Sequence, residues 1–119
     1  MAKKQKVEEF ITTALGSSGP MATIILLIDK AIILIKEMKE NPESRSNNSR
    51  RVRNILAQLQ MALNYTEGRD TVGLFTLYDY LYQEMQIADD LALDSAEKLL
   101  IQLRTTFKEL KKRIIIERR

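Results

Sequence analysis

The segment IILLIDKAIILIKEM at residues 24–38 constrains the fold of this chain more than any other part. Its apolar residues recur three and four positions apart, which is the period of an α-helix. Wound as a helix, the segment carries apolar side chains on nearly every side, interrupted only by Asp29-Lys30 and Lys36-Glu37. One apolar stripe is normally enough to dock a helix of a soluble protein on its core. We therefore expect one face of this helix to pack in a core and further apolar side chains to remain exposed.

The rest of the 119-residue chain also follows a helical period, and strand signals are lacking. Only four glycines and two prolines punctuate it, and they fall at or near plausible boundaries of the periodic segments. Asp94 is followed three residues later by Glu97, which is the capping-box spacing at a helix start. The pattern predicts helices from Pro20 to about Glu40, from Asn48 or Ser49 to Gly68, from Asp70 to about Asp89, and from Asp94 onward.

Four helices with short connections favour an all-α, antiparallel four-helix bundle in one domain, residues 1–119. The longest connection is the polar loop expected at 41–48. Residues 1–15 form an additional short amphipathic segment that could lie across the bundle and detach from it. Residues 112–119 form a basic tail.

The residue types present exclude most catalytic chemistry. The chain has no Cys and no His, so thiolate chemistry, the commonest general base and the commonest metal ligand are missing. Asp89, Asp90 and Asp94 cluster at a predicted helix end, where capping explains them. Tyr78 is expected to be half buried. We predict no catalytic residue, no cofactor and no metal site.

The sequence also bears on location and on nucleic-acid binding. No apolar run follows the N-terminal lysines, so no signal peptide is expected. The longest apolar run, Met21 to Ile28, is too short to span a bilayer, and a cytoplasmic protein is expected. The net charge is only +3, and no aromatic residues interleave with the arginines between Arg45 and Arg53. Solvated helix faces explain these arginines better than a nucleic-acid site does.

The surplus apolar surface of the segment 24–38 is confined to one stripe. At about 100° per residue, Leu26 and Ile33 lie opposite the core face, and Ile25 and Ile32 lie on its shoulder. Residues 1–15, a dimer partner or a loop could cover this stripe. An apolar helix of another protein is an equally good occupant.

Three strings follow one another along the chain: SSGPMATIILLIDKAIILI, then LQMALNYTEG joined to LYDYLYQEM, then LLIQLRTTFKEL. Their order and spacing resemble the flagellar secretion chaperone family (FliS-type). Phe107 stands where the family has Trp, and Phe10 where it usually has Tyr. Ile28 and Lys30 replace a Tyr and a Gly of the family. The matching positions are Pro20, Asp29, Ala31, Leu63, Asn64, Gly68, Leu77, Tyr78, Asp79, Tyr80, Leu103 and Arg104.

The resemblance implies a cytosolic helical bundle that binds the disordered C-terminal region of newly made flagellin. Binding would prevent premature polymerisation and keep flagellin competent for flagellar type III secretion. Other flagellar export or regulatory proteins are possible further partners. The resemblance also implies that the N-terminal segment can cover part of the apolar surface.

These expectations select the residues of a partner site. The expected flagellin contacts are Ile25, Leu26, Ile32 and Ile33, with Tyr78 and Asp79 as weaker choices. Phe10 and Ile11 are the expected N-terminal cover. The alternative function is a small helical adaptor or regulator that dimerises through the same apolar stripe.

Overall fold

The computed structural model describes residues 19–63 and 69–117, and within them every regular element is helical. The all-α prediction is confirmed. The expected segment 1–15, with Phe10 and Ile11, lies outside the described residues. The elements are α2 (Gly19–Glu40), the short 3-10 helix η2 (Pro42–Ser44), α3 (Arg45–Leu63), α4 (Arg69–Ile87) and α5 (Asp90–Glu117).

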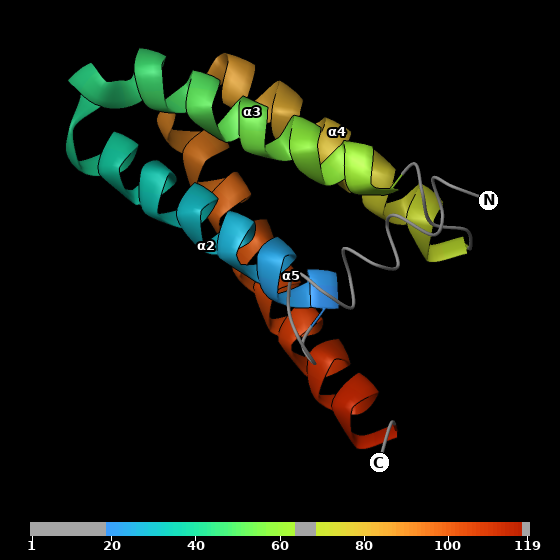
Figure 1. Ribbon diagram of the computed structural model, residues 1–119. Coiled ribbons are helices and arrows are strands. Elements are labelled where there is room, and N and C mark those ends of the chain that lie inside the picture. The colour runs from blue at the N-terminus through green and yellow to red at the C-terminus, as the bar shows by residue number, and fades with distance from the viewer. Residues whose placement is uncertain (1–18, 64–68, 118–119) are drawn as a thin grey trace.

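Successive helices run in opposite directions, so the described part is an antiparallel bundle (Figure 1). The helix α2 packs along both α5 and α3, while α4 packs mainly on α3 and less on α5. The four helices meet at the end that holds η2 and the α4–α5 turn, and α5 diverges from α3 and α4 toward the other end (Figure 1).

One apolar core joins the four helices, and α2 contributes the largest share of it. Its buried side chains recur three and four positions apart on α2, as the sequence pattern predicts. The buried core residues of α2 opposite its outer stripe are Ile28, Ala31, Leu34, Ile35 and Met38; the other helices add Val52, Ile55, Leu56, Leu59, Tyr78, Leu81, Met85, Leu93, Ala96, Leu100, Leu103 and Phe107.

Two sets of ion pairs define how α2 lies on α5. Lys39 Nζ is 2.5 Å from Asp94 Oδ1 and 3.2 Å from Glu97 Oε1. Arg104 Nη1 is 2.9 Å from Asp29 Oδ1. Asp29 precedes Lys39 by ten residues on α2, and its partner Arg104 follows Asp94, the partner of Lys39, by ten residues on α5. The two helices are therefore antiparallel without a slip in register.

The predicted polar loop at 41–48 is wrong, because α3 begins at Arg45 and only a short turn precedes it. Asn48 and Ser49 are buried within α3. Asn48 Nδ2 donates to the Leu34 carbonyl at 3.4 Å, and Ser49 Oγ donates to the Met85 carbonyl. A run of small polar residues reads as a loop in sequence, but here carbonyl partners on α2 and α4 allow two of them to be buried.

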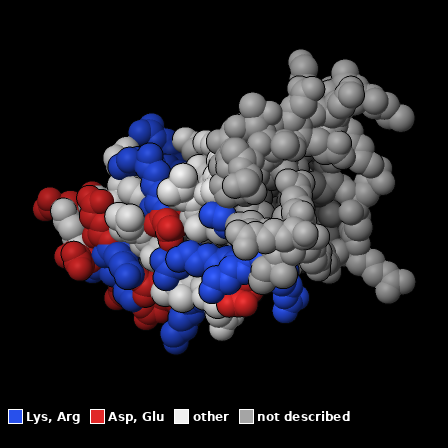
Figure 2. Space-filling view, turned by 60° about the horizontal axis from the view of Figure 1, so that its bottom comes forward, with Lys and Arg blue, Asp and Glu red and all other residues white. Residues whose placement is uncertain are grey.

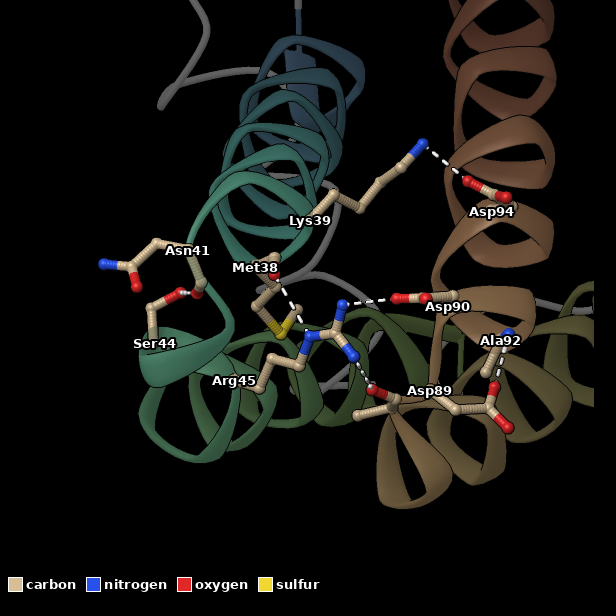
Figure 3. Close-up of polar contacts among 10 residues, drawn as sticks. Met38, Lys39, Asn41, Ser44, Arg45, Asp89, Asp90, Ala92 and Asp94 are labelled. Carbon is tan, nitrogen blue, oxygen red and sulfur yellow. Dashed lines mark hydrogen bonds and ion pairs between the residues drawn. The ribbon is translucent and has the colours of Figure 1, made fainter.

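Arg45 ties the ends of three helices together (Figure 3). Its Nε donates to the Met38 carbonyl at 3.1 Å, and its Nη1 donates to the Ala88 carbonyl at 3.4 Å. Its Nη2 lies 2.5 Å from Asp90 Oδ1. Ala88 has a positive φ of 51°, the left-handed conformation of many helix ends. The guanidinium thus satisfies carbonyls that helix ends leave without intrahelical partners.

The start of α5 also differs from the prediction. The helix begins at Asp90, and Asp89 Oδ1 accepts a hydrogen bond from the Ala92 amide at 2.8 Å, as an N-cap side chain does (Figure 3). Asp94 is therefore not a cap. Instead, Asp94 and Glu97 face α2 and both contact Lys39. These two carboxylates have the spacing of a capping box, but they form a contact between α5 and α2.

Candidate partner-binding site

The outer face of α2 carries the apolar stripe that the sequence predicts. Leu26 is 66% exposed and Ile33 is 63% exposed, although both belong to the most apolar segment of the chain. They are seven residues apart, about two helical turns, and so lie on one side of α2. The charged side chains of Lys30 and Glu37 are exposed on the same helix and border this stripe.

The prediction that Ile25 and Ile32 are exposed to a partner is corrected by their burial, because they are only 8% and 2% exposed. Both belong to the core cluster that joins the helices. Each immediately precedes a stripe residue, and the rotation of about 100° between neighbours turns it inward. Ile32 has no free surface for a partner, and Ile25 contributes only a margin of surface.

A groove of about 580 Å³ lies beside the stripe, between α2 and the second half of α5. Ala22, Ile25 and Leu26 form its wall on α2. The Asp29–Arg104 ion pair lies one helical turn further along α2 than Ile25, toward Ile33. On α5 the groove is lined by Thr105, Lys108, Glu109, Lys111 and Lys112.

The stripe and the groove share Leu26, so they form one surface, called here the α2 face: Ala22, the exposed margin of Ile25, Leu26, Ile33 and the α5 wall. An apolar floor next to a polar wall suits an amphipathic helix better than a compact polar ligand. The sequence indicates the stripe but not the wall. The lysines of the α5 wall lie in the string KELKKR, and the prediction placed only Lys112 and the residues after it in a basic tail.

Tyr78 and Asp79 lie apart from the α2 face, on α4. Tyr78 is fully buried in the core rather than half buried, and burial raises the pKa of its phenol. Asp79 is exposed, and its Oδ2 accepts a hydrogen bond from Gln83 Nε2 at 3.1 Å, one turn further along α4. A partner could reach Asp79 but not Tyr78, so Tyr78 is corrected from a contact to a core residue.

A second exposed apolar pair lies where α4 meets α5. Ile87 is 62% exposed and Leu91 is 79% exposed. They lie on either side of the turn that holds Ala88, at the far end of α5 from the groove. The sequence analysis missed this pair, because single apolar residues at a helix end give no periodic signal.

A comparison with protein-family models decides the family. The model described as flagellar protein FliS matches residues 3–114, nearly the whole chain. The chain belongs to the FliS family. Comparisons with curated proteins and with solved structures gave no match. Membership implies the general role of this family, that of a flagellar export chaperone.

Several residues that match the FliS pattern serve the fold rather than a partner. Asp29 and Arg104 come from different strings of the sequence and bind each other across α2 and α5. Ala31 and Leu103 are buried in the core, as is Phe107 in the place of the family's Trp. These positions of the FliS pattern therefore contribute to the helix packing of this chain.

Two further properties concern only the described part of the chain. No helix there is long and apolar enough to cross a membrane. No group of three or more acidic side chains there is arranged to hold a metal ion.

Proposed function

We propose that this FliS-family protein is a cytoplasmic export chaperone that binds the disordered C-terminal region of flagellin on the α2 face. The observation that carries the proposal is the exposed pair Leu26 and Ile33 on a helix whose other large apolar side chains are buried or half-buried. In a family of flagellar export chaperones, an exposed apolar stripe next to a groove is the natural place for a guest helix. The proposal needs no catalytic residue.

Apolar burial supplies affinity in this mechanism. Fully burying a Leu or Ile side chain is worth about 1.5–3 kcal/mol. Leu26 and Ile33 are each about two-thirds exposed, so together they contribute about 2–4 kcal/mol. Micromolar binding requires about 8 kcal/mol. The stripe alone is too small, and the groove beside it has to contribute as well.

Flagellin offsets part of the ordering cost by folding its segment into a helix on the chaperone. A segment held in this way is hidden from other flagellin subunits. Premature polymerisation is then prevented, and the subunit stays unfolded enough for type III export.

The N-terminal segment 1–15 is the proposed competitor for this surface. Phe10 and Ile11 are the apolar side chains that would occupy the α2 face in the free protein and leave when flagellin arrives. Under this proposal, a Phe10→Ala/Ile11→Ala variant binds flagellin more tightly than the unchanged protein, because no cover has to be displaced. Equal or weaker affinity would contradict the role of a cover.

The decisive experiment is titration of purified flagellin by calorimetry against the full chain and two double variants. Leu26→Asp/Ile33→Asp removes the stripe, and we expect at least about tenfold weaker binding. Ile87→Asp/Leu91→Asp is the matched control, since it places the same charges on similarly exposed apolar residues at the other end of α5. Circular dichroism verifies that both variants remain helical.

Two results would argue against the proposal. One is absence of flagellin binding to the unchanged protein, and the other is equal loss of affinity in the two double variants. Sedimentation distinguishes the alternative function, an adaptor that dimerises through Leu26 and Ile33. A chaperone sediments as a monomer until flagellin is added, whereas the adaptor forms a dimer that Leu26→Asp/Ile33→Asp dissociates.

A further inference from the structure

The α5 wall of the groove is strongly basic. Three of its residues, Lys108, Lys111 and Lys112, carry positive charge, and Glu109 carries the only negative charge in the described lining. Figure 2 turns the lower side of Figure 1 toward the reader and shows Lys and Arg side chains spread across the described surface, with acidic side chains densest toward its left end and a few among the basic ones. The groove thus combines an apolar floor with a cationic edge.

Among the described residues, the lysines of the wall have no acidic ion-pair partner that would neutralise them. Other basic side chains at the α2–α5 contact are paired: Lys39 with Asp94 and Glu97, and Arg104 with Asp29. No ion pair to a described carboxylate engages Lys108, Lys111 or Lys112. Lys108 and Lys112 are four residues apart and exposed, so they extend along one side of the groove.

We infer that the α2 face selects an amphipathic helix whose apolar stripe is flanked by carboxylates, which would lie against Lys108, Lys111 and Lys112. The inference rests on the proposed partner-binding role of this face and specifies the chemistry of the partner. Apolar side chains of the guest fill the groove over Ala22 and Leu26, while its acidic edge meets the lysines. Charge complementarity then fixes which way the guest helix is rotated about its own axis.

The magnitudes assign different tasks to the two kinds of contact. Exposed ion pairs contribute about 0.2–1 kcal/mol each, less than apolar burial does. The lysines therefore discriminate among apolar helices rather than hold the guest alone. A guest with lysines at the positions of these carboxylates would bind more weakly, because like charges across an interface repel each other.

The test uses the full chain and two synthetic helical peptides of about 18 residues. Both carry the same leucine stripe, flanked by Glu in one peptide and by Lys in the other. We expect the Glu peptide to bind at least about tenfold more tightly at low salt, with the difference shrinking as salt screens the charges. Equal affinity for the two peptides, or binding of neither, would overturn the inference.

Charge-reversal variants locate the effect. Lys108→Glu/Lys112→Glu should weaken binding of the Glu peptide by about tenfold and strengthen binding of the Lys peptide. Arg50→Glu/Arg51→Glu changes the net charge by the same amount on exposed residues of α3 and should alter both affinities by less than about twofold. Similar losses in the two double variants would mean that net charge, not the groove, selects the peptide, and the inference would fail.

The two proposals can fail separately. If flagellin does not bind but the Glu peptide is still preferred, the flagellin assignment falls and the acidic-helix inference stands. If flagellin binds while the peptides are not distinguished, only the inference falls. A stable dimer that buries Leu26 in the absence of any partner would also overturn it, because a second copy would then occupy the groove.

Discussion

Asp29 and Arg104, 75 residues apart in sequence, bind each other across α2 and α5, with 2.9 Å between Arg104 Nη1 and Asp29 Oδ1. Both side chains are about one-third exposed, so solvent screens the pair in part. The pair lies beside the groove and connects the two helices that form it. It stabilises the site without offering Asp29 to a partner.

Breaking this pair should cost a modest amount of stability. We expect Arg104→Ala to lower the free energy of unfolding by about 0.5–1 kcal/mol, since a partly exposed pair is worth little more. Urea denaturation of Asp29→Ala, Arg104→Ala and the double variant measures the coupling. Strictly additive losses would show that the two side chains do not interact in solution.

Ile32 and Ile33 are adjacent in sequence and should respond very differently to truncation. Ile32→Ala removes a buried side chain, and we expect a loss of about 2–4 kcal/mol in the free energy of unfolding. Ile33→Ala removes an exposed side chain and should change stability by less than about 0.5 kcal/mol. Denaturant melts of the two variants test the orientation of α2, and equal losses would contradict it.

The hydroxyl of Ser49 should contribute to the contact between α3 and α4. It is buried and donates to the Met85 carbonyl, so Ser49→Ala leaves that acceptor without this partner. We expect a loss of about 1–2 kcal/mol. Thermal melts of Ser49→Ala measure this loss of stability. Ser46→Ala, at an exposed position of the same helix, is the control and should leave the stability nearly unchanged in these melts.

Tyr78 should make the protein sensitive to alkaline pH. Burial raises the pKa of its phenol above the usual value of 10.0, so the folded state binds the phenolic proton more tightly than the unfolded state does. The resulting stabilisation is complete below pH 10 and is lost as pH rises toward the folded pKa. Tyr78→Phe should reduce the decline in stability above pH 10, measured by urea denaturation at several pH values. An unchanged decline would mean that other groups cause it.

Helical periodicity was enough to predict the bundle because burial of a helix depends mainly on spacing along one face. Residues such as Ile28, Ile35 and Leu100 are in the core, as their positions in the pattern predict. The same reasoning identified Leu26 and Ile33 as surplus. It failed for Ile25 and Ile32, because a residue on the shoulder of a helix is buried or exposed according to where the neighbouring helix lies.

Helix ends were predicted less well, since their hydrogen-bond partners come from distant parts of the chain. Arg45 can begin α3 because its guanidinium donates hydrogen bonds to the carbonyls of Met38 and Ala88 and to the carboxylate of Asp90. The spacing of Asp94 predicts a cap, whereas its carboxylate forms an ion pair with Lys39 of α2. Local spacing cannot distinguish a carboxylate that caps its own helix from one that contacts another helix.

The sequence by itself determined the helical class, the main buried face of α2 and the surplus pair on α2, because these follow from periodicity within one segment. Only the tertiary structure decided that the lysines of α5 lie beside Leu26 and that Asp29 is paired with Arg104. Those relationships depend on the antiparallel register of two helices far apart in sequence. That register follows from how side chains of both helices pack together, and neither segment specifies it alone.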